Sequence, residues 1–263
     1  MKRVVKPEAW RLEQEYARLN RYPQDRDGVA RVGGKEVFFA DAREFMKDYE
    51  RIFWRQTYDF PCLTANPRII DCSAGTGLAI RYWASRFSTP QIIALEPVAE
   101  CFRILKKTVA GVENAQVEVH HAALATTRHE LGDRIPNGEE SEASNGERET
   151  PSPDVVRLRD LLTQPVDFLK VCIREDGIEA ILDCRDAIKV VRQLCIDYHA
   201  VASNQQRFDE LLQFLRRMGY RYILRSGPVA DRPLFGIACS DNVDFRVDIM
   251  AVQEAREMSQ CSD

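Results

Sequence analysis

The sequence has no long apolar run, no closely paired cysteines and no excess of basic charge. Its 263 residues carry a formal net charge of −4, so no overall basic signature points to a nucleic-acid partner. No apolar stretch approaches the roughly 20 residues that cross a membrane. The basic N-terminus leads into Glu8 and Trp10 rather than an apolar core, so we expect no signal peptide. These absences favour a cytoplasmic protein with no membrane partner, and nothing in them sets an oligomeric state.

Cysteine usage gives no sign of a metal site or a disulfide framework. None of the eight cysteines forms a Cys-x-x-Cys pair, and no nearby histidine completes a zinc spacing. Several lie inside apolar runs, where cysteine serves as a small hydrophobic residue. We therefore expect reduced thiols and predict no metal. The eight are Cys62, Cys72, Cys101, Cys172, Cys184, Cys195, Cys239 and Cys261.

The sequence does contain an apolar run that ends in an aspartate and is followed by a turn of small residues. Residues 68–78 read RIIDCSAGTGL, and residues 91–97 read QIIALEP. This order predicts a strand, a glycine turn, a helix and a second strand that ends at Glu96. A turn without bulky side chains lets a ligand approach its backbone, and a carboxylate at the end of the second strand can accept hydrogen bonds from both hydroxyls of a ribose. The pair indicates an adenosine-type cofactor.

Two adenosine cofactors compete for this pattern. A dinucleotide fingerprint needs Gly-x-Gly-x-x-Gly, but Ile80 stands at the third glycine, where a bulky residue opposes close helix–strand packing. The alternative pattern places Asp71 before the glycines. That acid would repel a pyrophosphate, whereas it suits the ammonium group of S-adenosylmethionine. The sequence therefore favours S-adenosylmethionine, with a nicotinamide dinucleotide as the rival and a ligand-free structural turn as the simplest alternative.

The rest of the chain alternates apolar strand patterns with helix patterns, which predicts a mostly parallel sheet with helices on both faces. We expect seven strands, of which the last two pair antiparallel, as in a Rossmann-like methyltransferase sheet. The expected strands are 67–72, 91–96, 116–120, 166–173, 192–199, 220–225 and 234–240. The expected helices are 7–19, 42–55, 77–87, 98–110, 178–189 and 204–218.

The same patterns divide the chain into three parts. Residues 1–60 are expected to form a helical extension, with a turn-rich linker at 23–34. Residues 61–252 form the main domain, and 253–263 a flexible tail. Residues 132–153 are nearly devoid of apolar side chains and cannot bury enough surface to become ordered. We interpret them as a disordered loop, with a substrate lid as the alternative.

In order and spacing, several segments resemble the FkbM family of S-adenosylmethionine-dependent methyltransferases, from about Val37 to Val252. The cofactor loop at 69–78 and the ribose element at 94–97 are similar to that family's, as are the strand starting at 166–171 and the strand ending at 196–199. Cys172 departs from the pattern, which has an aspartate there. The resemblance implies O-methylation of a hydroxyl on a sugar, glycan or secondary metabolite.

Ligands of such a sheet bind beyond the carboxyl ends of its strands, and we place the candidate residues there. Asp71 is expected to hold the methionine moiety and Glu96 the ribose. His199 is the candidate general base because its unperturbed pKa lies near neutrality, with Asp197 orienting it and Lys170 as a further base or anion holder. The cofactor-binding candidates are Asp71, Ser73, Gly75, Gly77, Glu96, Pro97, His121 and Ala122.

Each catalytic candidate also has a plainer interpretation. His199 fits a hydrogen-bonded histidine at a strand end, and Lys170 fits a salt bridge to a nearby carboxylate. Because Cys172 replaces the expected aspartate, the alternative function is a catalytically degenerate methyltransferase fold that binds the cofactor in a regulatory role.

Overall fold

The computed structural model describes residues 14–23, 26–32, 34–126, 152–174, 177–201, 206–227 and 243–254. The chain forms two compact units. As far as they are described, the first contains residues up to 67 together with 73–123 and 152–154, and the second contains residues 68–72, 124–126 and 155–254.

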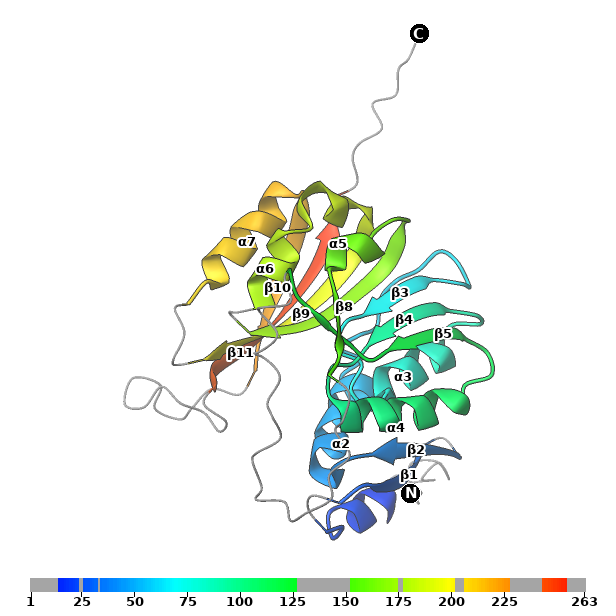
Figure 1. Cartoon of the computed structure of the whole chain (residues 1–263). Coiled ribbons are helices and arrows are strands. Elements are labelled where there is room, and N and C mark those ends of the chain that lie inside the picture. Colours follow the sequence, from blue (N-terminus) through cyan, green and yellow to red (C-terminus); the bar gives the residue numbers. More distant parts are fainter. Residues whose placement is uncertain are drawn as a thin grey trace, which may run out of the picture. The chain divides into compact units, whose positions relative to one another are not determined.

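Figure 1 labels the helices and strands where there is room. In chain order they are β1 (Gly28–Val32), β2 (Lys35–Phe39), α2 (Ala42–Tyr49), the π-helix η1 (Glu50–Trp54), β3 (Arg68–Asp71), α3 (Leu78–Arg86), β4 (Gln91–Leu95), α4 (Ala99–Ala110), β5 (Gln116–His120), β6 (Ala122–Leu124), β7 (Asp154–Val156), α5 (Leu158–Leu161), β8 (Val166–Arg174), α6 (Ile178–Leu182), the 3-10 helix η4 (Arg185–Val190), β9 (Val191–Val201), α7 (Phe208–Arg217), β10 (Tyr220–Ser226) and β11 (Val243–Gln253).

Seven of the strands form one mixed sheet in the order β10-β11-β9-β8-β3-β4-β5. β3 runs parallel to β8, β8 parallel to β9, and β4 parallel to β5. β11 runs opposite to its neighbours, because it pairs antiparallel with both β9 and β10. The predicted fold class is thereby confirmed: an α/β fold with a seven-stranded, mostly parallel sheet and an antiparallel final strand.

In the first unit, an aromatic stripe on α2 and η1 forms part of the core, as its helical spacing predicts. Asp41 starts α2 by accepting hydrogen bonds from the backbone N–H groups of residues 43 and 44, a standard N-cap. Phe45 and Tyr49 are buried and stack on one another, and Tyr49 stacks on Phe53. The predicted helix over 42–55 is therefore present, but its last turn widens to a π-helix.

The predicted turn-rich linker at 23–34 is wrong, because residues 28–32 form β1 and pair antiparallel with β2. Burial on one face stabilises this hairpin: Ala30 and Val37 are paired and both are buried. Of the predicted helix at 7–19, the structure describes residues 14–19, which are helical.

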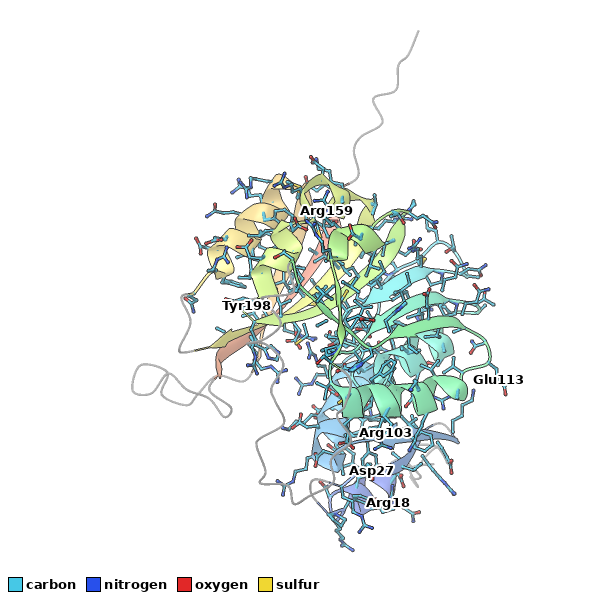
Figure 2. The ribbon with its side chains drawn as sticks, viewed as in Figure 1. Arg18, Asp27, Arg103, Glu113, Arg159 and Tyr198 are labelled. Carbon is cyan, nitrogen blue, oxygen red and sulfur yellow. The ribbon has the colours of Figure 1, made fainter. Side chains whose placement is uncertain are left out.

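In the second unit, α7 packs against one face of the strands that carry the candidate catalytic residues. Tyr198 of β9, labelled in Figure 2, is fully buried and packs on the ring of Phe208 at the start of α7. Since successive strand residues point to opposite faces, Asp197 and His199 point away from Phe208. The packing of Tyr198 thus determines which face carries these two side chains.

Other boundaries differ from expectation in instructive ways. The predicted helix at 178–189 splits into α6 and η4 around Asp183, and the last strand is β11 at Val243–Gln253. The predicted strand at 234–240 lies outside the described residues, as does the predicted loop at 132–153 except for 152 and 153. In the described part of the chain, every helix is too short or too polar to cross a membrane.

Candidate functional site

The glycine turn between β3 and α3 has two glycines with different tasks. Gly75 and Gly77 both adopt left-handed backbone conformations, with φ of +55° and +88°. A Cβ atom on Gly77 would lie 2.9 Å from Leu105 Cδ1, so this glycine is needed for packing against α4. A Cβ on Gly75 would meet nothing within 4 Å. The backbone at Gly75 therefore faces open space that a ligand can enter, as the small residues of the turn predict.

Glu96, just after β4, is joined to that turn. Its Oε2 accepts a hydrogen bond of 2.7 Å from the backbone N–H of Gly75, and its Oε1 accepts one of 2.8 Å from the backbone N–H of Val98. The residue is 5% exposed. A carboxylate accepts hydrogen bonds from hydroxyl as well as amide donors. The structure thus brings the predicted ribose acid to the predicted glycine turn.

The remaining cofactor candidates of the first unit follow Glu96 and β5. His121 Nε2 lies 3.0 Å from the carbonyl oxygen of Pro97, and the imidazole stacks on the Phe102 ring at a centroid distance of 5.1 Å. Ala122 is buried. His121 is therefore held beside the segment that follows Glu96, and it presents a flat ring supported by an aromatic residue of α4.

In the second unit, Asp71 and Lys170 form a buried ion pair. They are register partners on the parallel strands β3 and β8, and Lys170 Nζ lies 2.8 Å from Asp71 Oδ1. Asp71 is completely buried, and the Lys170 side chain is only 8% exposed. The plainer interpretation of Lys170, a salt bridge, is what the structure shows. A base role for Lys170 stays a prediction, and the neighbouring carboxylate opposes it because it favours the protonated amine.

A polar cluster lies on one face of β8, β9 and β11. Cys172 is the register partner of Asp197, and Arg246 is the partner of His199. Three atoms approach His199 Nε2: Asp197 Oδ1 at 3.1 Å, the Nε of Arg246 at 3.1 Å, and Cys172 Sγ at 3.7 Å. The expected pairing of Asp197 with His199 is therefore present, and the cluster also holds two residues that the sequence did not assign to it.

This environment sets the charge of His199. Burial by itself lowers the pKa of the imidazole, but the hydrogen bonds to Asp197 and Cys172 outweigh it and raise the pKa to about 9. The contact to Asp197 needs a proton on Nε2, whereas the N–H of Arg246 needs a lone pair on the same nitrogen. The two contacts belong to two protonation states, so the Arg246 guanidinium favours the neutral imidazole.

Sequence reasoning missed Arg246 for a definite reason. It placed the final strand at 234–240, whereas β11 occupies 243–253 and carries the arginine to His199. Residues 246–249 do alternate polar and apolar side chains, and this is the signal that could have found the strand. Two residues further along, Asp248 pairs with Arg225 at 2.7 Å and extends the polar row on β11.

The sheet topology and the glycine turn with its acid define a Rossmann-like methyltransferase domain. The chain matches the methyltransferase FkbM domain over residues 71–222, which is more than half of its length. The protein therefore belongs to the FkbM methyltransferase family, and the predicted family and its cofactor, S-adenosylmethionine, are confirmed.

Comparison with individual proteins gives partial matches. The chain is 34% identical over 62 residues to the methyltransferase sdnD of Sordaria araneosa, a stretch that is 24% of either protein. The chain thus spans about a quarter of that relative. Among solved structures it is similar to M. jannaschii TYW2 in complex with AdoMet, with 16% identity, 88% and 87% coverage and a TM-score of 0.45. It is also similar to the Methanococcus jannaschii fibrillarin pre-rRNA processing protein, with 11% identity, 88% and 84% coverage and a TM-score of 0.46.

Proposed function

We propose that this protein transfers a methyl group from S-adenosylmethionine to a hydroxyl oxygen of a sugar, glycan or secondary metabolite. One observation carries the proposal: the Glu96 carboxylate is hydrogen-bonded to the backbone of Gly75, where the turn is open to a ligand. Family membership supports the reaction class. The net charge of −4 supports a small-molecule or glycan acceptor over nucleic acid, and a cytoplasmic location is part of the same proposal.

The described residues of the first unit fit an adenosine group. The open backbone at Gly75 gives room for a ligand, and the Glu96 carboxylate, hydrogen-bonded to that backbone, is the group that we assign to the ribose hydroxyls. His121, stacked on Phe102, offers a ring beside which a nucleobase can pack. We assign three further residues to the same cofactor site. Pro97 follows Glu96 in sequence, Ala122 follows His121, and Ser73 precedes the two glycines of the turn.

The second unit contributes Asp71, which immediately precedes this turn in sequence. We propose that it holds the ammonium group of the methionine moiety, either directly or through water. Its Oδ1 accepts a hydrogen bond of 2.8 Å from Lys170 Nζ. In this proposal Lys170 acts on the cofactor through Asp71 and takes no proton itself.

When bound, the cofactor supplies a methyl group already activated by a sulfonium, so the protein has two tasks: to align the acceptor and to remove its hydroxyl proton. We assign the second task to His199. Its side chain is 17% exposed, against 6% for Asp197, so the imidazole is open to an acceptor. Once Nε2 carries the acceptor's proton, Asp197 Oδ1 at 3.1 Å accepts a hydrogen bond from it and holds the ring in place.

A second candidate function is cofactor binding without methyl transfer. Cys172 stands where the family resemblance expects an aspartate, and its thiol contacts the proposed base at 3.7 Å. A thiol at this position lacks the permanent charge of a carboxylate. If the missing aspartate were needed for acceptor binding or proton transfer, the protein would still bind the cofactor but would transfer no methyl group.

One pair of measurements separates the two functions. Calorimetry with S-adenosylhomocysteine reports cofactor binding, and transfer of a labelled methyl group to a panel of hydroxylated sugars, glycans, metabolites and RNA reports turnover. Binding with labelled product from a hydroxylated small molecule supports the methyltransferase. Binding with no labelled product supports the degenerate protein, labelled RNA would overturn the acceptor class, and tighter binding of a nicotinamide dinucleotide would revive the oxidoreductase.

A further inference from the structure

The side chains of Cys172, Asp197 and His199 bring together three different metal-binding atoms. The sulfur, a carboxylate oxygen and an imidazole nitrogen all lie within 4.8 Å of one another. They come from two adjacent parallel strands, in which Cys172 and Asp197 are register partners and His199 lies two residues further on the same face. We propose that these three residues form a binding site for a divalent transition-metal ion of the Zn²⁺ type.

The distances between the ligand atoms match a tetrahedral zinc site. Zinc binds sulfur at about 2.3 Å and nitrogen or oxygen at about 2.0–2.1 Å. Tetrahedral angles then separate sulfur from nitrogen by about 3.6 Å and nitrogen from oxygen by about 3.3 Å. The observed separations are 3.7 Å for Cys172 Sγ to His199 Nε2 and 3.1 Å for His199 Nε2 to Asp197 Oδ1. An ion fits after shifts of a few tenths of an ångström.

The burial of the three residues leaves an open side to this site. Asp197 is buried and His199 is half-buried, whereas Cys172 is exposed. An ion can therefore enter past the thiol, and water can complete the fourth position, as in sites with three protein ligands. The combination of sulfur, imidazole and carboxylate favours Zn²⁺ or Co²⁺ over Mg²⁺ and Ca²⁺, which prefer oxygen ligands alone.

Arg246 is the group that opposes the ion. Its Nε lies 3.1 Å from His199 Nε2, and its terminal nitrogen lies 3.7 Å from Asp197 Oδ2. The side chain is 47% exposed, so it can turn into solvent when an ion takes its place. Binding releases the thiol proton and any proton on Nε2 to solvent. Thiolate and carboxylate together then balance the two charges of the ion.

An ion at this position would occupy the nitrogen that takes the acceptor's proton. Metal binding should therefore inhibit methyl transfer, and chelation should restore it. This consequence rests on the proposed role of His199, whereas the binding itself depends only on the three ligands. Sequence spacing could not indicate such a site, because Cys172 lies 27 residues from His199, on a separate strand.

Cobalt titration of the full chain tests the site without any methyl-transfer assay. In reducing, chelator-free buffer, Co²⁺ bound to a thiolate gives a charge-transfer absorption in the near ultraviolet. We expect the band to saturate at one Co²⁺ per chain and to be displaced by Zn²⁺. Cys172→Ser should abolish the band and weaken Co²⁺ binding at least tenfold. The matched control is Cys62→Ser, since Cys62 contacts Thr64 rather than an imidazole, and it should leave band and affinity unchanged.

Further variants make the test decisive. Asp197→Ala should weaken Co²⁺ binding, and Arg246→Gln should tighten it, because that change removes the competing cation and keeps a polar side chain. Absence of the band in the wild type, or a band that persists in Cys172→Ser, would overturn the proposal. Either result would leave the proposed methyltransferase standing, since the readout needs neither cofactor nor acceptor.

Discussion

Replacing Glu96 by glutamine tests the cofactor half of the proposed function with the smallest change in shape. The native carboxylate accepts two short hydrogen bonds, from the backbone N–H groups of Gly75 and Val98. A glutamine side chain has one acceptor oxygen and one N–H₂ group, so one of the two backbone donors must face another donor. The change therefore acts on the turn and removes one acceptor for the ribose.

The magnitude follows from these contacts. Leaving a buried hydrogen-bonding group unsatisfied costs about 1–3 kcal/mol, and more when a charged partner is lost. We expect Glu96→Gln and Glu96→Ala to weaken S-adenosylhomocysteine binding by about that much. Since 1.4 kcal/mol corresponds to a tenfold change, the dissociation constant should rise by about 5- to 150-fold.

Calorimetry with S-adenosylhomocysteine measures this loss, and urea unfolding of the same variants shows how much of it reflects the turn itself. Glu100→Gln is the matched control, because Glu100 is an exposed acid four residues away that pairs with Arg103 at 3.1 Å. We expect its affinity to stay within twofold of wild type. A folded Glu96→Gln variant that binds S-adenosylhomocysteine as tightly as the wild type would refute the assignment of Glu96 to the ribose.

The other predictions concern the base, the turn and the ion pair. His199→Ala should lower turnover at least about 100-fold, the usual contribution of a general base, and leave S-adenosylhomocysteine affinity within twofold; full turnover would eliminate His199 as the base. Gly77→Ala should lower the free energy of unfolding by at least about 2 kcal/mol, since it adds a steric clash to an unfavourable φ. Gly75→Ala meets no clash and should lower it by only about 1–2 kcal/mol. Equal losses for the two variants in urea unfolding would contradict this. Lys170→Met should cost about 3–5 kcal/mol because it leaves the buried Asp71 carboxylate without its lysine, and an unchanged urea midpoint would show that the pair is not stabilising.

The cofactor turn and its acid could be predicted from sequence because their relation is local. A strand, a tight turn, a helix and a neighbouring parallel strand form one βαβ unit, and such units have a narrow range of geometries. Glu96 therefore had to end near the turn once residues 68–78 and 91–97 were recognised, and the 2.7 Å hydrogen bond to Gly75 bears this out. Helical periodicity similarly predicted the buried stripe of α2.

The polar cluster on β8, β9 and β11 was harder to predict from sequence. Alternation along a strand tells which residues share a face, but not which strand lies beside it or in what register. Asp197 and His199 could be paired because they are two residues apart. Lys170 and Asp71 are 99 residues apart and meet only through the register of β3 and β8.

By itself, the sequence determined the methyltransferase class, the alternation of strands and helices, and the glycine turn with Glu96 beside it, since each depends on residues close together in the chain. Only the tertiary structure decided that Cys172 joins Asp197 and His199, and that Arg246 comes from 47 residues further on to contact the same imidazole. The physical reason is that these contacts depend on the pairing of β8, β9 and β11, which is set by the packing of the whole second unit.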